Sequence, residues 1–191
     1  MTINVLDRGY AATRDVFAAI NGAGWDTPSA CADWSVRQCG NHLVASVRLL
    51  ARVAEGETVP PADFDARSMA DTDNLGTDPA GAFAAVAKRS VAAFARPGAL
   101  TELFGFPPGP TPGLVLANIS LMEAVVHGWD LARGADVPYP IDAAVVAALG
   151  GFVTQAIGDE QRKAGLFGPK LPVAPDANPL TGLLAHLGRS A

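Results

Sequence analysis

The stretch from Leu114 to Leu131 is apolar on nearly every side of a predicted helix. A surface helix keeps one polar face, so an apolar helix of this kind predicts a buried, central position in an α-helical core. Glu123 and His127 interrupt the stretch four residues apart, and the helical period places both on one face. A buried glutamate is unfavourable without a partner, and a divalent cation is one candidate for that partner.

Capping signals predict that most of the remaining chain is also helical. Ser35 with Gln38 has the pattern of a capping box, and Asp78 and Asn178 each precede a proline at the first position of a predicted helix. Strand-type alternation is limited to short apolar runs, such as residues 100–106, which predict at most a small hairpin. A polar loop is expected over residues 57–77. Helices are expected over about residues 4–21, 35–55, 78–96, 111–134, 142–157 and 178–188.

These elements together predict the fold class. Four long helices with long crossover connections and a small C-terminal helical addition indicate an all-α protein built as a four-helix bundle. A length of 191 residues suits one domain, which is expected to span residues 1–191. Bundles of this class build metal sites between facing helices.

The composition limits the kinds of partner. Hydrophobic residues make up 49% of the chain and charged residues 17%, a balance that leaves apolar surface and favours a homodimer. A net charge of −5 without any basic run argues against a nucleic-acid partner. The longest uncharged run, residues 103–122, contains four prolines, so no membrane span is expected. Membrane binding is not expected either, because no polybasic or lipidation signal is found. With no leader pattern at its start and only two cysteines, the chain is expected to be cytoplasmic.

His42 is a further candidate metal ligand. It lies early in the helix expected to begin at Ser35, in the sector of Cys39 that should face inward. Together, His42, Glu123 and His127 would present two imidazoles and one carboxylate from two inward helix faces. This set matches the three protein ligands usual for catalytic zinc, with a fourth position open to water or substrate. The same donors also suit nickel and other divalent ions.

Structural interpretations of these residues remain open beside the metal interpretation. An inward histidine is commonly a hydrogen-bonded core residue, and Glu123 is equally able to pair with a core arginine. Asp130 projects to the same side of its helix as Glu123. There it either orients a metal ligand through a hydrogen bond or pairs with Arg37 or Arg133.

The other notable residues are first assigned to packing. Cys39 is expected to be a small buried hydrophobe, with direct metal ligation as the alternative. Trp34 and Trp129 are expected to pack, although tryptophans beside a pocket also contact ligands. His186 is expected to be partly exposed on the last helix. The Pro- and Gly-rich segment 104–113 is expected to connect two helices rather than to rim a pocket.

Three blocks of the sequence support a family resemblance. They are Trp34–Arg37 followed by Asn41–Leu43, Glu123–Leu131, and the tail Pro179–Arg189. In these blocks and in its helix spacing the chain resembles DinB-like four-helix bundles. More narrowly, it resembles the metal-binding domain of mycothiol-dependent maleylpyruvate isomerases and their short actinobacterial relatives.

The resemblance implies a site and a chemistry. It implies that His42, Glu123 and His127 bind a divalent metal, commonly zinc, and that the metal binds a low-molecular-weight thiol such as mycothiol. A zinc-bound thiolate that adds to an activated double bond would give isomerisation, and one that displaces a leaving group would give S-transfer. The full isomerases carry a further C-terminal domain that contributes to their active site. This chain is expected to lack that domain, which favours a thiol S-transferase over maleylpyruvate isomerisation.

Three classes of function therefore remain open. The first is a metal-dependent enzyme that uses a thiol and a small electrophile, with an open metal position and a pocket for a sugar-thiol. The second is a non-catalytic metal-binding stress protein with the same ligands. The third is a metal-dependent hydrolase, which needs a general base beside the metal, and Asp130 is the only obvious candidate.

Overall fold

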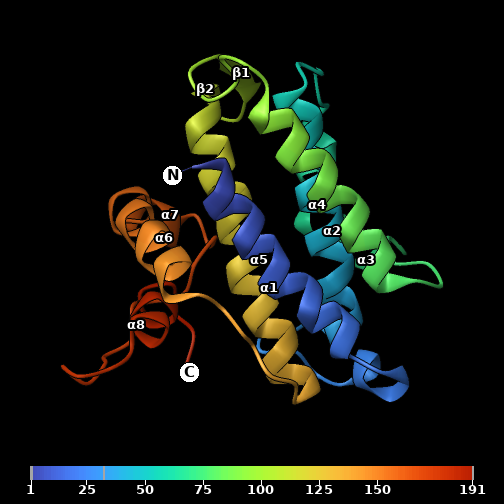
Figure 1. Cartoon of the computed structure of the whole chain (residues 1–191). Coiled ribbons are helices and arrows are strands. Elements are labelled where there is room, and N and C mark those ends of the chain that lie inside the picture. Colours follow the sequence, from blue (N-terminus) through green and yellow to red (C-terminus); the bar gives the residue numbers. More distant parts are fainter. Residues whose placement is uncertain (1, 32, 191) are drawn as a thin grey trace. The chain divides into compact units, whose positions relative to one another are not determined.

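The computed structural model describes residues 2–31 and 33–190 (Figure 1). The chain divides into two compact units, Met1–Pro140 and Ile141–Ala191. The first unit contains four long helices, α1 (Ile3–Ala19), α2 (Val36–Ala54), α4 (Pro79–Ala95) and α5 (Gly113–Ala135). Its shorter elements are the 3-10 helices η1 (Gly22–Asp26) and η2 (Pro61–Phe64), helix α3 (Ala66–Asp71), and strands β1 (Leu103–Phe106) and β2 (Gly109–Pro112).

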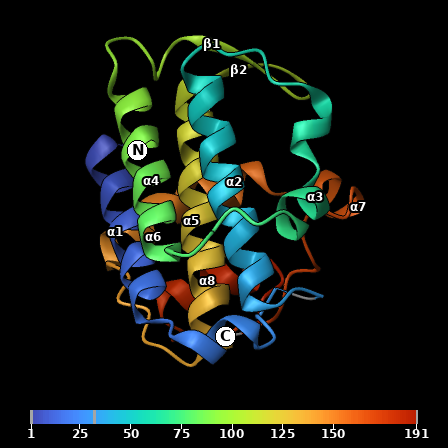
Figure 2. The same cartoon turned by 90° about the vertical axis from the view of Figure 1, so that its right-hand side faces the viewer.

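The four long helices form a bundle in which each helix packs against two others. Both α4 and α5 pack against α1 and α2, so the order around the bundle is α1, α4, α2, α5. Helices α2 and α4 run in one direction, and α1 and α5 run in the other (Figure 2). Since α2 and α4 are parallel, the chain must return along the bundle between them, and it does so through η2 and α3. The predicted all-α four-helix bundle with long crossover connections is confirmed.

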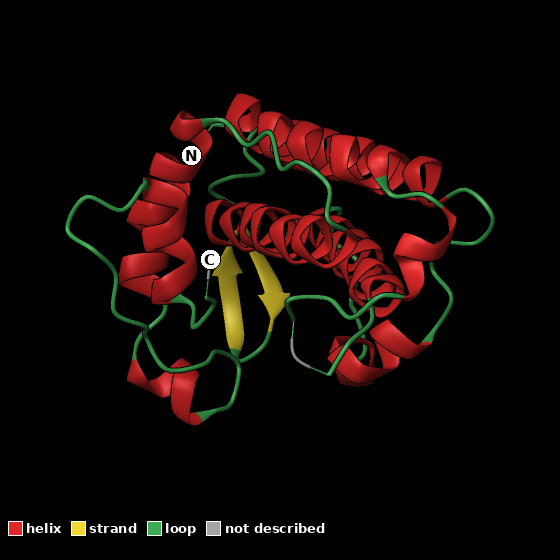
Figure 3. Cartoon of the chain, turned by 90° about the horizontal axis from the view of Figure 1, so that it is seen from below, coloured by secondary structure: helices red, strands yellow, loops and turns green. Residues whose placement is uncertain are grey.

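A small hairpin joins α4 to α5. Strands β1 and β2 pair antiparallel, with Leu103 opposite Pro112 and Phe106 opposite Gly109. They form the only sheet in the described part of the chain, seen in yellow in Figure 3. This is the small hairpin that the apolar run at residues 100–106 predicted.

The second unit consists of helices α6 (Ala143–Ala156), α7 (Asp159–Lys163) and α8 (Pro179–His186). Within it α6 packs against α8. The Arg162 guanidinium donates hydrogen bonds to the carbonyl oxygens of Gly168 and His186, at 2.6 and 2.7 Å. This unit is the predicted C-terminal helical addition. The expectation of one domain over residues 1–191 stays a prediction.

The helix ends lie within two residues of the predicted ones, and side-chain caps fix the starts of α2, α4, α6 and α8. At the start of α2, Ser35 Oγ accepts from the Gln38 amide and Gln38 Oε1 accepts from the Ser35 amide, which completes the capping box. The side chains of Asp78, Asp142 and Asn178 cap α4, α6 and α8. The prediction was incomplete elsewhere: η2 and α3 lie within the loop expected over residues 57–77, and η1 and α7 lie outside every expected helix. Residues 111–112, which were expected to begin a helix, belong to β2.

Tyr10 joins three helices of the bundle. Its buried hydroxyl on α1 lies 2.7 Å from Ser90 Oγ on α4 and 2.7 Å from Ser120 Oγ on α5. Burial raises the pKa of Tyr10 to about 12, and the hydrogen bonds of Ser120 and Ser90 only partly oppose that rise. Each such hydrogen bond contributes about 1 kcal/mol net, and a buried hydroxyl left without a partner is more unfavourable than that.

Helix α5 is the core helix, as its apolar sequence predicted. Almost all of its side chains from Leu116 to Ala132 are buried. Among the described helices it alone is long and apolar enough to cross a membrane by length and composition, and 78% of that apolar window is buried inside the protein. A core helix satisfies the same criteria, and the burial of α5 identifies it as one.

Two glycines let other backbone segments approach α5 closely. A Cβ atom at Gly128 would lie 2.7 Å from Thr13 Oγ1, whose hydroxyl donates to the Ala124 carbonyl at 2.8 Å. A Cβ atom at Gly134 would lie 2.6 Å from the Pro28 carbonyl oxygen. The segment that precedes α2 is therefore packed directly on the C-terminal turns of α5.

Candidate metal centre

The three predicted ligands lie together between α2 and α5. His42 Nε2 is 3.1 Å from Glu123 Oε2, and His127 Nε2 is 3.6 Å from the same oxygen. One donor atom from each residue lies within 4.8 Å of the other two. The His42 and His127 side chains are 10% and 11% exposed, whereas the Glu123 side chain is 21% exposed. The cluster is thus enclosed on the histidine side and reaches solvent at the glutamate.

The local sequence of each helix sets this arrangement. Glu123 and His127 are four residues apart on α5, so their side chains stack on one face. The capping box at Ser35 fixes where α2 begins, and therefore which of its side chains face α5. His42 lies on that face. Because α2 and α5 are packed neighbours, two patterns far apart in the sequence meet at one place.

Asp130 orients His127. Its carboxylate Oδ2 lies 2.9 Å from His127 Nδ1, and the Asp130 side chain is completely buried. A carboxylate in this position favours the tautomer with a proton on Nδ1, which leaves the Nε2 lone pair directed at the cluster. Of the two predicted roles for Asp130, the structure gives it contact with the histidine, while Arg37 lies 4.0 Å from Asp26 instead.

A second buried hydroxyl lies beside Asp130. Burial raises the pKa of Tyr139 above its ordinary value; a side-chain interaction with Thr13 partly opposes that rise, and the negative charge of Asp130 adds to it. Tyr139 therefore stays neutral, and its hydroxyl donates to the Val125 carbonyl at 2.8 Å. The tyrosine therefore adds no charge near Asp130.

His42 is held differently from His127. Its ring packs on the Trp34 ring, with centroids 4.8 Å apart, and Ser46 Oγ lies 3.3 Å from its Nε2. No described group hydrogen-bonds the buried Nδ1 atom of His42. Ring packing and contacts at Nε2 therefore hold His42, whereas Asp130 holds His127 through its Nδ1.

Trp34 and Ser46 are site residues that sequence reasoning did not select. Trp34 was assigned to packing, and its ring contacts both histidines, with a centroid separation of 6.1 Å to His127. Ser46 follows His42 by one helical turn, so the helical period was the available signal for it. Its hydroxyl also lies 3.5 Å from the Met69 sulfur of α3, which brings the crossover segment to the edge of the site.

Cys39 is buried and His186 is partly exposed, as expected. Cys39 is completely buried, and its sulfur lies 3.6 Å from His127 Nδ1, on the side of the ring away from Glu123. His186 is on α8, where its Nε2 lies 3.1 Å from the Ile157 carbonyl oxygen. His186 belongs to neither group of possible metal-binding side chains in the described part of the chain.

The donor set fits a divalent metal. Metal bonds of about 2.0–2.2 Å to nitrogen and oxygen separate two such ligands by about 3.4 Å in a tetrahedral site. The observed separations of 3.1 and 3.6 Å lie on either side of that value. His127 also has the carboxylate partner that metal-binding histidines commonly have.

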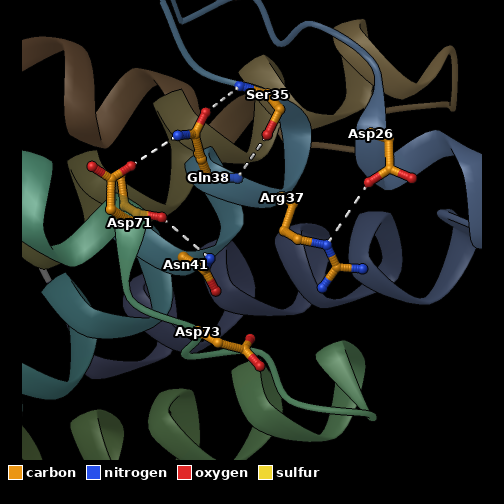
Figure 4. A pocket seen from close by; sticks show the side chains of 8 residues that line it. Asp26, Ser35, Arg37, Gln38, Asn41, Asp71 and Asp73 are labelled. Atoms are coloured by element: carbon orange, nitrogen blue, oxygen red, sulfur yellow. Dashed lines mark hydrogen bonds and ion pairs between the residues drawn. The ribbon is translucent and has the colours of Figure 1, made fainter.

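A polar cavity opens beside the first turns of α2 (Figure 4). Its volume is about 440 Å³, and Gln38, which lines it, precedes His42 by one helical turn. Hydrogen bonds from Arg67 and Gln38 hold the pKa of the Asp71 carboxyl below its usual value, so this wall of the cavity is anionic. The residues that line the cavity are Asp26, Ser35, Arg37, Gln38, Asn41, Ala70, Asp71 and Asp73.

The hairpin segment lines a second cavity, at the C-terminal end of α2. This cavity has a volume of about 580 Å³ and an aromatic wall that includes Phe64, Phe104 and Phe106. The rings of Phe64 and Phe106 meet edge to face, with centroids 5.3 Å apart. Segment 104–113 thus connects two helices, as predicted, and also borders a cavity, which was not predicted.

Comparisons with known proteins identify relatives of the chain. Residues 6–132 match the family described as the mycothiol maleylpyruvate isomerase N-terminal domain. Two uncharacterized proteins of Mycobacterium tuberculosis, from strains CDC 1551 / Oshkosh and H37Rv, are each 27% identical over 164 residues, which cover 85% of this chain and 84% of the relative.

Solved structures agree at the level of the fold. The crystal structure of a mycothiol-dependent maleylpyruvate isomerase superposes with a TM-score of 0.55 at 16% identity, covering 82% of this chain and 71% of that one. A variant of that enzyme with one histidine replaced by alanine gives a TM-score of 0.54 at 15% identity, with the same coverage. The predicted DinB-like helical fold is confirmed.

Proposed function

The chain belongs to the family of mycothiol maleylpyruvate isomerase N-terminal domains, and on this premise we propose that it is a metal-dependent enzyme that uses a thiol of the mycothiol type. We propose His42, Glu123 and His127 as the metal ligands, with zinc as the first choice of metal and nickel as the second. The observation that carries the proposal is the convergence of their three donor atoms within 4.8 Å of one another.

The chain's own residues prepare the site for such chemistry. A zinc ion bound there would act as a Lewis acid that lowers the pKa of a bound thiol, so that the thiolate is present near neutral pH. Asp130 keeps the His127 Nε2 lone pair directed at the cluster, and Trp34 covers both imidazole rings. The partly exposed Glu123 marks the side from which a thiol and an electrophile would approach.

The groups that line the polar cavity favour a thiol compound whose other part is hydrophilic. The cavity begins one helical turn from His42 and combines the Arg37 guanidinium with amide and carboxylate groups. Such groups are able to hydrogen-bond the hydroxyl and amide groups of a sugar-thiol, whereas an apolar thiol would displace their water without replacing its hydrogen bonds. We propose that this cavity holds the sugar part of the thiol.

The hydrolase alternative has less support. A hydrolase needs a general base within hydrogen-bond reach of a metal-bound water. Asp130 was the only candidate, and it is completely buried with its carboxylate on His127 Nδ1, the ring atom directed away from the cluster. The geometry therefore favours a thiol as the nucleophile over water.

Calorimetric titration of the zinc-loaded protein with mycothiol tests this function. We expect saturable binding of one mycothiol per zinc and much weaker binding of S-methyl mycothiol, which has no thiol to ionise. The variant Arg37→Ala should weaken mycothiol binding and leave the zinc content unchanged, because Arg37 lines the cavity and is not a proposed ligand. Equal binding of mycothiol and its S-methyl form, or no binding of either, would contradict the proposal.

Assays with electrophiles then distinguish the two reactions. Conversion of maleylpyruvate in the presence of mycothiol would identify isomerisation, and release of a leaving group from an alkylating electrophile would identify S-transfer. We propose S-transfer, carried out in the cytoplasm by a homodimer.

A further inference from the structure

Both cysteines of the chain lie near one side of His127. Cys39 Sγ is 3.6 Å from His127 Nδ1. The Cys31 sulfur, one His127 ring nitrogen and an Asp130 carboxylate oxygen lie within 4.8 Å of one another. Both cysteines are thiols, and the sequence contains no others. Cys31, His127 and Asp130 thus offer one sulfur, one imidazole nitrogen and one carboxylate oxygen as a compact group. The Cys39 sulfur lies outside that group but close to His127 Nδ1, the nitrogen that faces Asp130, so it would complete the set by a small movement.

The spacing of this group suits a cation. Bonds of about 2.3 Å to sulfur and about 2.0 Å to nitrogen place a sulfur and a nitrogen ligand about 3.5 Å apart in a tetrahedral site. The separation of Cys39 Sγ and His127 Nδ1 is 3.6 Å, close to that value before any cation is bound. Thiolate ligands select soft cations, and a mixed sulfur, nitrogen and oxygen set is typical of zinc and its heavier congeners.

We propose that Cys31, Cys39, His127 and Asp130 form a second cation site, which binds a thiophilic divalent ion such as Cd²⁺. On binding, each thiol releases its proton to solvent and forms a sulfur–metal bond. The His127 proton moves from Nδ1 to Nε2, so the imidazole stays neutral. Cys31 is partly exposed, whereas Cys39 and Asp130 are completely buried, so the ion would enter from the Cys31 side.

The two sites exclude each other, a consequence that rests on the proposed function. A neutral imidazole has one nitrogen lone pair, so His127 binds a cation either through Nδ1 or through Nε2. A cation on the cysteine side leaves a proton on Nε2, which removes one ligand from the site of His42 and Glu123. A thiophilic ion would therefore release zinc from that site and stop the proposed thiol chemistry.

The direct test is a titration of the full-length, metal-free protein with Cd²⁺, followed by the ultraviolet charge-transfer absorbance of thiolate–cadmium bonds. Because Cys31 and Cys39 are the only cysteines, any such absorbance comes from them. We expect saturation at one Cd²⁺ per chain. The variants Cys31→Ala and Cys39→Ala should each lose a large part of the absorbance and bind Cd²⁺ on the order of tenfold or more weakly.

The variant His42→Ala separates this proposal from the proposed function. It removes a ligand of the His42–Glu123 site only, so we expect its cadmium absorbance to equal that of the wild type. If the wild type gives the full thiolate–cadmium absorbance but retains no zinc, the proposed function is contradicted and the cysteine site is supported. The absence of thiolate–cadmium absorbance in the wild type, or an undiminished signal in Cys39→Ala, would overturn the cysteine site.

Competition between the sites is measured as zinc release. Cd²⁺ added to the zinc-loaded wild type should release zinc to a chromophoric indicator. At the same Cd²⁺ concentration, the double variant Cys31→Ala/Cys39→Ala should retain its zinc. Equal release from both proteins would mean that Cd²⁺ displaces zinc directly, and would overturn the mutual exclusion.

Discussion

His127 has different neighbours at its two ring nitrogens. Nδ1 faces the buried Asp130 carboxylate at 2.9 Å, and Nε2 faces Glu123 at 3.6 Å. A carboxylate at Nδ1 determines the tautomer and the ring orientation, and both decide whether Nε2 can bind a metal. At the scale of single residues, Asp130 is therefore as important to the proposed zinc site as a direct ligand.

Asp130→Asn should weaken zinc binding about tenfold to hundredfold while the fold is retained, because the amide replaces a charged acceptor with a neutral one. Competition with a chromophoric chelator measures the change. Asp136→Asn is the matched control: Asp136 is exposed and has a left-handed backbone conformation that asparagine also adopts, so its affinity should not change. Unchanged zinc affinity in Asp130→Asn would show that the hydrogen bond to His127 does not support the site.

Tyr10→Phe should lower the free energy of unfolding by about 1–3 kcal/mol near neutral pH, because the buried hydroxyls of Ser90 and Ser120 lose their shared partner. Urea unfolding with circular dichroism measures this loss. A fully stable variant would show that the two serines find other partners.

The wild type and Tyr10→Phe should also differ in how their stability depends on alkaline pH. Burial raises the pKa of Tyr10 from 10 to about 12, so the unfolded chain ionises first. The stabilisation that the neutral Tyr10 hydroxyl gives the folded protein is complete below pH 10. The free energy of unfolding then falls by roughly 2–3 kcal/mol as the pH rises to about 12. The stability advantage of the wild type over Tyr10→Phe should therefore shrink over that range, and a constant difference would contradict the assignment.

Some site residues were predictable from the sequence and others were not. The helical period alone placed Glu123 and His127 on one face and turned His42 inward. Trp34 precedes the helix, so no periodic pattern indicated that its ring would cover both histidines. The approach of Cys31 to Asp130 depends on how a loop folds onto another helix, and residue spacing carries no such information.

At the scale of elements, caps made the long helices predictable. Four helices, α2, α4, α6 and α8, are each capped by the residue that the sequence indicated at their start. These residues are Ser35, Asp78, Asp142 and Asn178. Helix α3 has six residues and was missed, because a run so short shows less than two turns of a 3.6-residue period. The order of helices around the bundle depends on pairwise packing, which the sequence pattern does not specify.

Gly134→Ala should destabilise the protein by about 1–3 kcal/mol, since its methyl group would lie 2.6 Å from the Pro28 carbonyl and force the segment before α2 away from α5. Gly151→Ala in α6 is the matched control. Gly151 is exposed with nothing near its absent side chain, so alanine there should stabilise by about 0.5–1 kcal/mol. Denaturant unfolding should give opposite signs for the two variants, and equal effects would refute the close packing at Gly134.

At the scale of the whole molecule, the relation between the two compact units determines how the chain unfolds. All three proposed ligands lie in Met1–Pro140, and none lies in Ile141–Ala191. We predicted a single domain, and a single domain unfolds in one cooperative step. Differential scanning calorimetry should show one transition whose calorimetric and van't Hoff enthalpies agree. Two transitions, only one of them shifted by zinc, would show that the units unfold independently.

Zinc retention in histidine variants tests the central claim most directly. The chain has three histidines, and His186 of α8 serves as an internal control because it is outside the candidate site. After equilibrium dialysis against zinc, elemental analysis should find one zinc per chain in the wild type and in His186→Ala. It should find almost none in proteins that carry His42→Ala or His127→Ala together with Cys31→Ala and Cys39→Ala, in which the proposed cysteine site is also removed. Stoichiometric zinc in these combined variants, with circular dichroism unchanged, would contradict the account.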